Sequence, residues 1–177
     1  MDPVYGLLRE RLTDARRLAV LGVGSTLRSD DAAGIRIVSS LQAAFGPKYP
    51  GLLFCVGGTA PENFSGTIRR FNPDILLIID SADFGAKAGT IMEIKPETIG
   101  GPTYCSHMLP LRVMIDYLAV ESGARFILLG IQYKSLAFDS EMTPEIRNAA
   151  DRLEGALKEI ILNNHPALGD PPRRGII

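Results

Sequence analysis

The sequence predicts a three-layer α/β/α sandwich built on a mostly parallel sheet of about five strands. Several short runs of the chain are apolar throughout, and each has the length of one buried strand. Such runs are typical of parallel strands, because helices cover both faces of a parallel sheet. Segments with apolar residues at helical spacing lie between these runs. Strands that alternate with helices in this way indicate an α/β domain.

The first half of the chain supplies three expected strands and the helices between them. The strands are expected at residues 17–24, 51–58 and 74–80, each a continuous apolar run. Apolar spacing predicts helices over residues 4–16, through Ile35, Val38, Leu41 and Phe45, and from Ala60 to Arg70. The acidic sequence Ser29-Asp30-Asp31 is expected to cap the second of these helices. Pro61 suits the first turn of the third.

The second half of the chain supplies the remaining layers. Residues 90–96 alternate apolar and polar side chains, which favours an edge strand or one side of a hairpin. Residues 124–132 form the last apolar run, and we expect a buried strand there. Helices are expected over residues 107–121 and 142–163. The sequence that follows is rich in Pro, Gly and Asn, and we expect it to be irregular.

The length of 177 residues suits a single domain. We expect this domain to span residues 1–177, with an N-terminal helical appendage at 1–16, an α/β core at 18–163 that holds the candidate site, and an irregular tail at 164–177. No internal repeat or interior linker interrupts the core.

Composition excludes several classes of function. The formal net charge is -1, and basic residues occur in pairs rather than in a patch, so nucleic-acid binding is not expected. Charged residues interrupt the N-terminal segment, and no apolar run approaches the roughly 20 residues that span a membrane. We therefore expect a cytoplasmic protein. The two cysteines, Cys55 and Cys105, have no metal-binding or disulfide spacing.

Three side chains that can bind a metal are expected at the carboxyl edge of the sheet. Asp31 follows the first strand, Asp80 ends the third, and His107 begins a later helix. Ligands of open α/β sheets bind at this edge. Two carboxylates and an imidazole suit a divalent transition metal and leave coordination positions for another molecule. The trio contains too little sulfur for a structural zinc site.

Each of these residues also has a structural interpretation. Acidic residues at a helix start cap free N–H groups, and we expect Asp30 to be the cap and Asp31 the ligand. A carboxylate that ends an apolar strand, such as Asp80, is paired, solvated or functional. A histidine near a helix start is often a surface residue, and His165 is expected to be exposed. The convergence of Asp31, Asp80 and His107 on one edge favours the metal site.

Other catalytic patterns are weaker. The segment GVGSTLRSDDAAG lacks the third glycine of a dinucleotide-binding loop and places two acids where a phosphate would lie. No GxSxG elbow is present. Cys105 and His107 occupy alternate positions of an extended segment and would point to opposite faces, which argues against a thiol protease pair.

The chain resembles the hydrogenase maturation endopeptidases, especially the branch that serves formate-hydrogenlyase-type hydrogenases. The resemblance covers roughly residues 18 to 161. Its segments occur in the same order as in the family: GVGSTLRSDDAAGIRIV, GGTAPEN, LLIIDSADFGAKAGTI, SHMLPL, LLGIQ and MTPEI. The resemblance implies a five-stranded α/β/α fold of the phosphorylase/hydrolase-like type. It also implies a peptidase that removes a C-terminal extension from a nickel–iron hydrogenase large-subunit precursor after nickel insertion.

The resemblance assigns roles to residues of this chain. The metal-contacting positions fall on Asp31, Asp80 and His107, the same three residues that position alone suggested. The nickel is supplied by the precursor rather than kept by the protease, and zinc or cadmium can take its place in crystals. Gly57, Gly58 and Glu62 are expected to shape the substrate cleft.

One departure from the family leaves alternatives open. The aspartate that commonly precedes the double glycine is Val56 here, so the chain lacks a carboxylate at that position. The metal can polarise the scissile carbonyl or activate water, or it can position the peptide while an aspartate acts as general base. A non-catalytic chaperone that checks nickel in the immature large subunit is the alternative function, and a hydrolase or phosphorylase that shares only the fold is a third. A monomer is expected.

Overall fold

The computed structural model describes residues 3–95 and 108–164, and within them one five-stranded sheet in the order β2-β1-β3-β5-β4. Four strands are parallel, and β4 pairs antiparallel with β5 at one edge. The strands span Leu18–Val23 (β1), Leu52–Gly58 (β2), Ile75–Ala82 (β3), Ile91–Glu93 (β4) and Arg125–Gln132 (β5). The central strand β3 is buried along its whole length, as its apolar sequence predicts.

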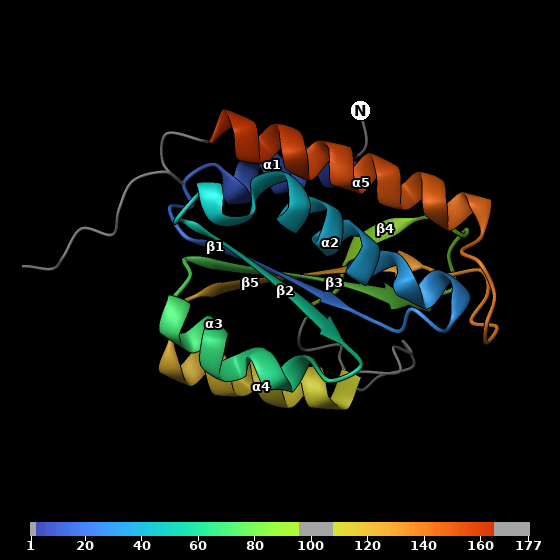
Figure 1. The fold of residues 1–177 in the computed structure, drawn as a ribbon, viewed down its shortest axis with the longest axis horizontal. Helices are drawn as coiled ribbons and strands as arrows, with labels where there is room; N and C mark the ends of the chain where they lie inside the picture. Colours follow the sequence, from blue (N-terminus) through green and yellow to red (C-terminus); the bar gives the residue numbers. More distant parts are fainter. Residues whose placement is uncertain (1–2, 96–107, 165–177) are drawn as a thin grey trace, which may run out of the picture.

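Helices cover both faces of this sheet (Figure 1). One face carries α1 (Pro3–Leu12), α2 (Ala33–Phe45) and α5 (Pro144–Asn163), and the other carries α3 (Ser65–Phe71) and α4 (Met108–Glu121). Alternate residues of each strand enter two separate cores. Leu77 packs in the core beneath α2 and α5, whereas its neighbours Leu76 and Ile78 pack beneath α4. The predicted three-layer α/β/α fold is confirmed.

Two of the expected helices are shorter in the structure than the sequence predicts. The helix expected over residues 60–70 is divided into a 3-10 turn at Pro61–Phe64 and the shorter α3. The first helix ends at Leu12, before residue 16. Beyond it, the carboxylate of Asp74 accepts hydrogen bonds of 2.8 Å from the backbone N–H groups of Arg16 and Arg17. These bonds hold the chain in the turn that leads into β1.

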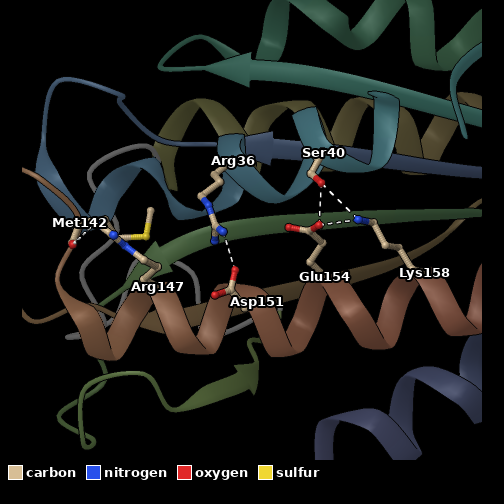
Figure 2. A network of polar contacts seen from close by, with 7 residues as sticks. All are labelled: Arg36, Ser40, Met142, Arg147, Asp151, Glu154 and Lys158. Carbon is tan, nitrogen blue, oxygen red and sulfur yellow. Dashed lines mark hydrogen bonds and ion pairs between the residues drawn. The ribbon is translucent and has the colours of Figure 1, made fainter. Parts of the chain in front are cut away.

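A polar network joins α2 to α5 (Figure 2). Arg36 forms an ion pair with Asp151. The Oε1 atom of Glu154 accepts hydrogen bonds of 2.6 Å from the Ser40 hydroxyl and from Lys158. Partial burial opposes the charged form of Glu154, but the bonds from Lys158 and Ser40 outweigh it and lower the pKa of this carboxyl.

Across residues 3–95 and 108–164, none of the helices combines the length and the apolar character needed to cross a membrane.

Candidate active site

Glycines bring the start of α2 into direct contact with the sheet. A Cβ atom at Gly34 would lie 2.7 Å from the carbonyl oxygen of Val23 and nearer still to that of Ile79. No other residue type fits there, because real Cβ atoms do not approach carbonyl oxygens this closely. Gly24 has a φ of +130°, and a Cβ there would overlap the carbonyl oxygen of Asp31. These contacts place Asp31 beside the carboxyl ends of β1 and β3.

Ser81 connects the two predicted carboxylates. Its hydroxyl donates a hydrogen bond to Oδ1 of Asp31, and its backbone N–H donates one of 2.8 Å to Oδ1 of Asp80. Asp31 is 2% exposed and Asp80 is fully buried. Ser81 thus contacts both Asp31 and Asp80 near the carboxyl end of β3. His107, the third predicted member, lies outside the described residues.

The two carboxylates have chemistry that suits a cation. Buried acidic groups that lie close together repel one another when both are charged, and a metal ion removes that repulsion. A carboxylate can accept several contacts at once, so the bonds from Ser81 orient each group and still allow it to bind a metal. Among residues 3–95 and 108–164, no three His, Cys, Asp or Glu side chains form a metal-binding group. His107, the third member of the predicted trio, is not among these residues.

The predicted capping role of Asp30 is wrong. The N-cap residues of the 3-10 turn Ser29–Ala32 and of α2, which are Arg28 and Ala32, make no side-chain capping hydrogen bond. The buried carboxylate of Asp30 instead accepts four hydrogen bonds from residues far along the chain. They come from the N–H groups of Lys134 (2.9 Å), Ser135 (2.8 Å) and Thr143 (2.7 Å), and from the Thr143 hydroxyl (3.1 Å).

The residues expected to shape the substrate cleft lie at the end of β2 and just beyond it. Gly58 has a φ of +59°, and its carbonyl accepts a 3.0 Å hydrogen bond from Gly24. A Cβ at Gly57 would lie 2.8 Å from the Leu21 side chain, so this position also favours glycine. Glu62 is exposed in the 3-10 turn that follows. Val56, which precedes the double glycine, is 36% exposed.

The sequence interpretation missed a second fixed loop at this edge. Gln132 ends β5, and its Oε1 accepts hydrogen bonds from the N–H groups of Phe84 (2.9 Å) and Ala86 (3.2 Å). Its Nε2 donates to Oδ1 of Asp83 at 3.1 Å. This bond and a bond from the N–H of Gly85 lower the pKa of the Asp83 carboxyl. A polar residue that ends an apolar strand, the signal used for Asp80, would also have identified Gln132.

Other features of the described residues lie away from the carboxylates. Cavities of about 380 and 710 Å³ lie between α1, β4 and α5, and both are lined by Val4, Ile91 and Arg152. Neither cavity is lined by Asp31 or Asp80. Cys55 is buried, and burial raises the pKa of its thiol to about 11, so it is not a nucleophile at neutral pH.

Comparison with known proteins shows the family to which the chain belongs. The HycI hydrogenase maturation protease family model matches residues 35–160. The hydrogenase 3 maturation protease of Escherichia coli strain K12 is 37% identical over 141 residues, which cover 77% of this chain and 88% of the relative.

Two experimentally determined structures of related proteins agree with this match. The [NiFe] hydrogenase maturation protease HycI from Thermococcus kodakarensis superposes with a TM-score of 0.80 at 29% identity, covering 88% of this chain and 99% of that one. The endopeptidase HycI from Escherichia coli gives a TM-score of 0.68 at 33% identity, covering 78% and 87%. The resemblance found in the sequence is thus confirmed, and the chain belongs to the hydrogenase maturation protease family of endopeptidases.

Proposed function

We propose that this protease removes the C-terminal extension of a nickel–iron hydrogenase large-subunit precursor after nickel insertion, and that it recognises the nickel held by the precursor. The observation that carries the proposal is the bridge of Ser81 between Asp31 and Asp80. Two oriented acidic groups at the carboxyl edge of a parallel sheet form a site for a cation that arrives with the substrate. The family membership supports the protease activity.

In this proposal Asp31, Asp80 and His107 contact the nickel of the precursor. Carboxylate oxygens and an imidazole nitrogen complement the thiolates that already hold the metal in the precursor. Gly57, Gly58 and Glu62 border the cleft that takes the peptide. Glycines at this position allow a substrate backbone to approach closely.

The same residues allow two routes to peptide hydrolysis. The nickel polarises the scissile carbonyl or activates a water molecule, with Asp31, Asp80 and His107 as its protein ligands. In the other route the nickel only positions the peptide, and one aspartate acts as the general base. In both routes Ser81 keeps the carboxylates in place while the substrate binds.

Nickel belongs to the substrate in this scheme. Three protein ligands without a thiolate hold nickel weakly, so the protease purified without added metal should contain far less than one nickel per chain. Nickel that survives dialysis against a chelator at full stoichiometry would contradict this. Zinc or cadmium in a crystal should occupy the same three side chains, at about 2.0–2.3 Å for zinc-like ions.

The decisive experiment compares nickel-loaded and nickel-free precursor. We expect purified protease to lower the mass of the loaded precursor by the mass of its C-terminal extension, and to leave the nickel-free precursor intact. Binding of the loaded precursor without any mass change would instead indicate the nickel-checking chaperone. Cleavage of both forms at equal rates would reject nickel recognition and leave a nickel-independent peptidase.

The proposal also includes the cellular setting. We propose a cytoplasmic monomer whose partner is the large-subunit precursor. Cell fractionation and sedimentation at several protein concentrations test these two points. A concentration-dependent increase in mass would reject the monomer.

A further inference from the structure

The loop that carries Asp31 is held by a segment that lies about a hundred residues later in the sequence. The Ser29 hydroxyl donates a 2.8 Å hydrogen bond to the carbonyl of Glu141. The N–H of Asp139 donates one of 2.9 Å to the carbonyl of Leu27, and the N–H of Asp30 donates to the carbonyl of Ser135 at 3.2 Å. Residues 134–143 connect β5 to α5. Several hydrogen bonds therefore join this connection to residues 27–30.

Asp30 is the centre of this pairing. It is fully buried, and both oxygens of its carboxylate accept hydrogen bonds from residues 134, 135 and 143. Hydrogen bonds to an ionised carboxylate are stronger than neutral ones, and a buried carboxylate depends on them because it has lost its water. Loss of this group would leave three buried or partly buried N–H donors without their acceptor.

The loop also contains backbone conformations that need external support. Ser29 has a φ of 41° and Asp139 a φ of 51°, which side-chain-bearing residues seldom adopt. Such conformations persist only where surrounding contacts fix them. Each of these two residues is held by the other segment. The Ser29 hydroxyl donates to the Glu141 carbonyl, and the Asp139 N–H donates to the Leu27 carbonyl.

We propose that Asp30 is a positioning residue of this protease. Its carboxylate fixes residues 134–143 against the loop, and this contact sets the backbone from which the Asp31 side chain reaches Ser81. Asp30 does not contact the substrate. The inference rests on the role proposed above for Asp31, and it assigns to the preceding acid a task distinct from both metal binding and helix capping.

The variant Asp30→Asn tests this role with little change in volume. An amide has only one acceptor oxygen, so asparagine cannot accept at both positions and must place an NH2 group against an N–H donor. Asp74→Ala is the matched control. Asp74 also accepts hydrogen bonds from two backbone N–H groups, but it precedes β3 at the amino edge of the sheet, whereas Asp80 lies towards the carboxyl end of that strand.

Both variants should melt at a lower temperature than the unmodified protein, and kinetics should be measured well below either transition. For nickel-loaded precursor we expect Asp30→Asn to lower kcat by about tenfold or more with KM little changed, because a small misplacement of a reacting group is costly. Asp74→Ala should keep the original kcat. Equal losses in the two variants, or an unchanged kcat in Asp30→Asn, would overturn the proposal.

Hydrogen–deuterium exchange gives a readout that does not depend on the reaction. Asp30→Asn should speed exchange in peptides that cover residues 25–33 and 134–143, whereas Asp74→Ala should speed it near residues 16–18. Unchanged exchange at 25–33 in Asp30→Asn would also reject the role. If the unmodified protein does not trim the precursor, the proposed function fails, and the exchange result still decides whether Asp30 fixes the loop.

A milder variant covers the case in which Asp30→Asn does not fold. Thr143→Val removes only the hydroxyl that donates to Asp30 and keeps the backbone donor of the same residue. It should change kcat and exchange at residues 25–33 in the same direction, by a smaller factor. No change in either quantity would count against the proposal.

Discussion

The hydroxyl of Ser81 donates a hydrogen bond to the carboxylate of Asp31, which lies fifty residues earlier in the chain. Ser81 is 4% exposed, so this bond forms in a nearly dry environment. The backbone N–H of the same serine contacts Asp80. One residue therefore contacts both of the acidic groups that we place in the active site.

Removal of the Ser81 hydroxyl should impair the reaction more than it impairs folding. Ser81→Ala deprives Asp31 of a donor in a buried position, which costs about 1–3 kcal/mol in typical cases. We expect a clear loss of trimming activity. Ser122→Ala is the control, because Ser122 is also buried and donates its hydroxyl to the Leu118 carbonyl at the end of α4. Both variants should be assayed on nickel-loaded precursor. Equal activities would show that the Ser81 hydroxyl has no part in the site.

His107 provides the cleanest test of the proposed nickel contacts. The chain has only one other histidine, His165, near its C-terminal end. We expect His107→Ala to fold normally, to lose trimming of the precursor and to bind nickel-loaded precursor less tightly. Thermal melts should precede the assays. A variant that melts normally and still trims at the original rate would mean that His107 is not part of the site. Asp31→Ala and Asp80→Ala should likewise abolish trimming.

Gly34 should not tolerate even a methyl group. Gly34→Ala places a Cβ against the main chain of β1 and β3, where nothing can move aside cheaply. We expect a loss of stability of about 3 kcal/mol or more, in the range of severe overpacking. Gly155→Ala in α5 is the control, since no atom lies within 4 Å of the added Cβ. It should be neutral or stabilise by about 0.5–1 kcal/mol. Urea denaturation of the two variants measures the difference.

Acid should weaken the contact between α2 and α5. The folded-state pKa of Glu154 is lowered, so its contribution to stability is present above the unfolded-state pKa and is lost as pH falls through the folded value. Melting temperatures between about pH 7 and pH 3 should therefore fall less steeply in Glu154→Gln than in the unmodified protein. Parallel curves for the two proteins would show that the network in Figure 2 does not link stability to this carboxyl.

The fold could be predicted from the sequence because strand and helix patterns depend on residues that are close together in the chain. Strand β3 is buried along its length, and the run ILLIID that predicts it needs no distant partner to be recognised. Position at a strand end likewise predicted that Asp31 and Asp80 lie at the carboxyl edge of the sheet, where Ser81 contacts each of them. Asp30 was misjudged because its hydrogen-bond partners lie 104 to 113 residues away, whereas capping is a local rule. Ser81 was missed for the same reason, since its partner Asp31 belongs to another strand's loop.

The contact of Gly34 with two strand carbonyls has a consequence for how this protease can vary. Peptide units have nearly fixed dimensions, whereas side chains differ in size and rotamer. Because Gly34 meets the carbonyl groups of β1 and β3 through main-chain atoms, we expect this contact of α2 to persist when one aliphatic core residue is exchanged for another. The place of the Asp31 loop on the sheet should therefore depend on the glycine at position 34 more than on the sizes of the core side chains.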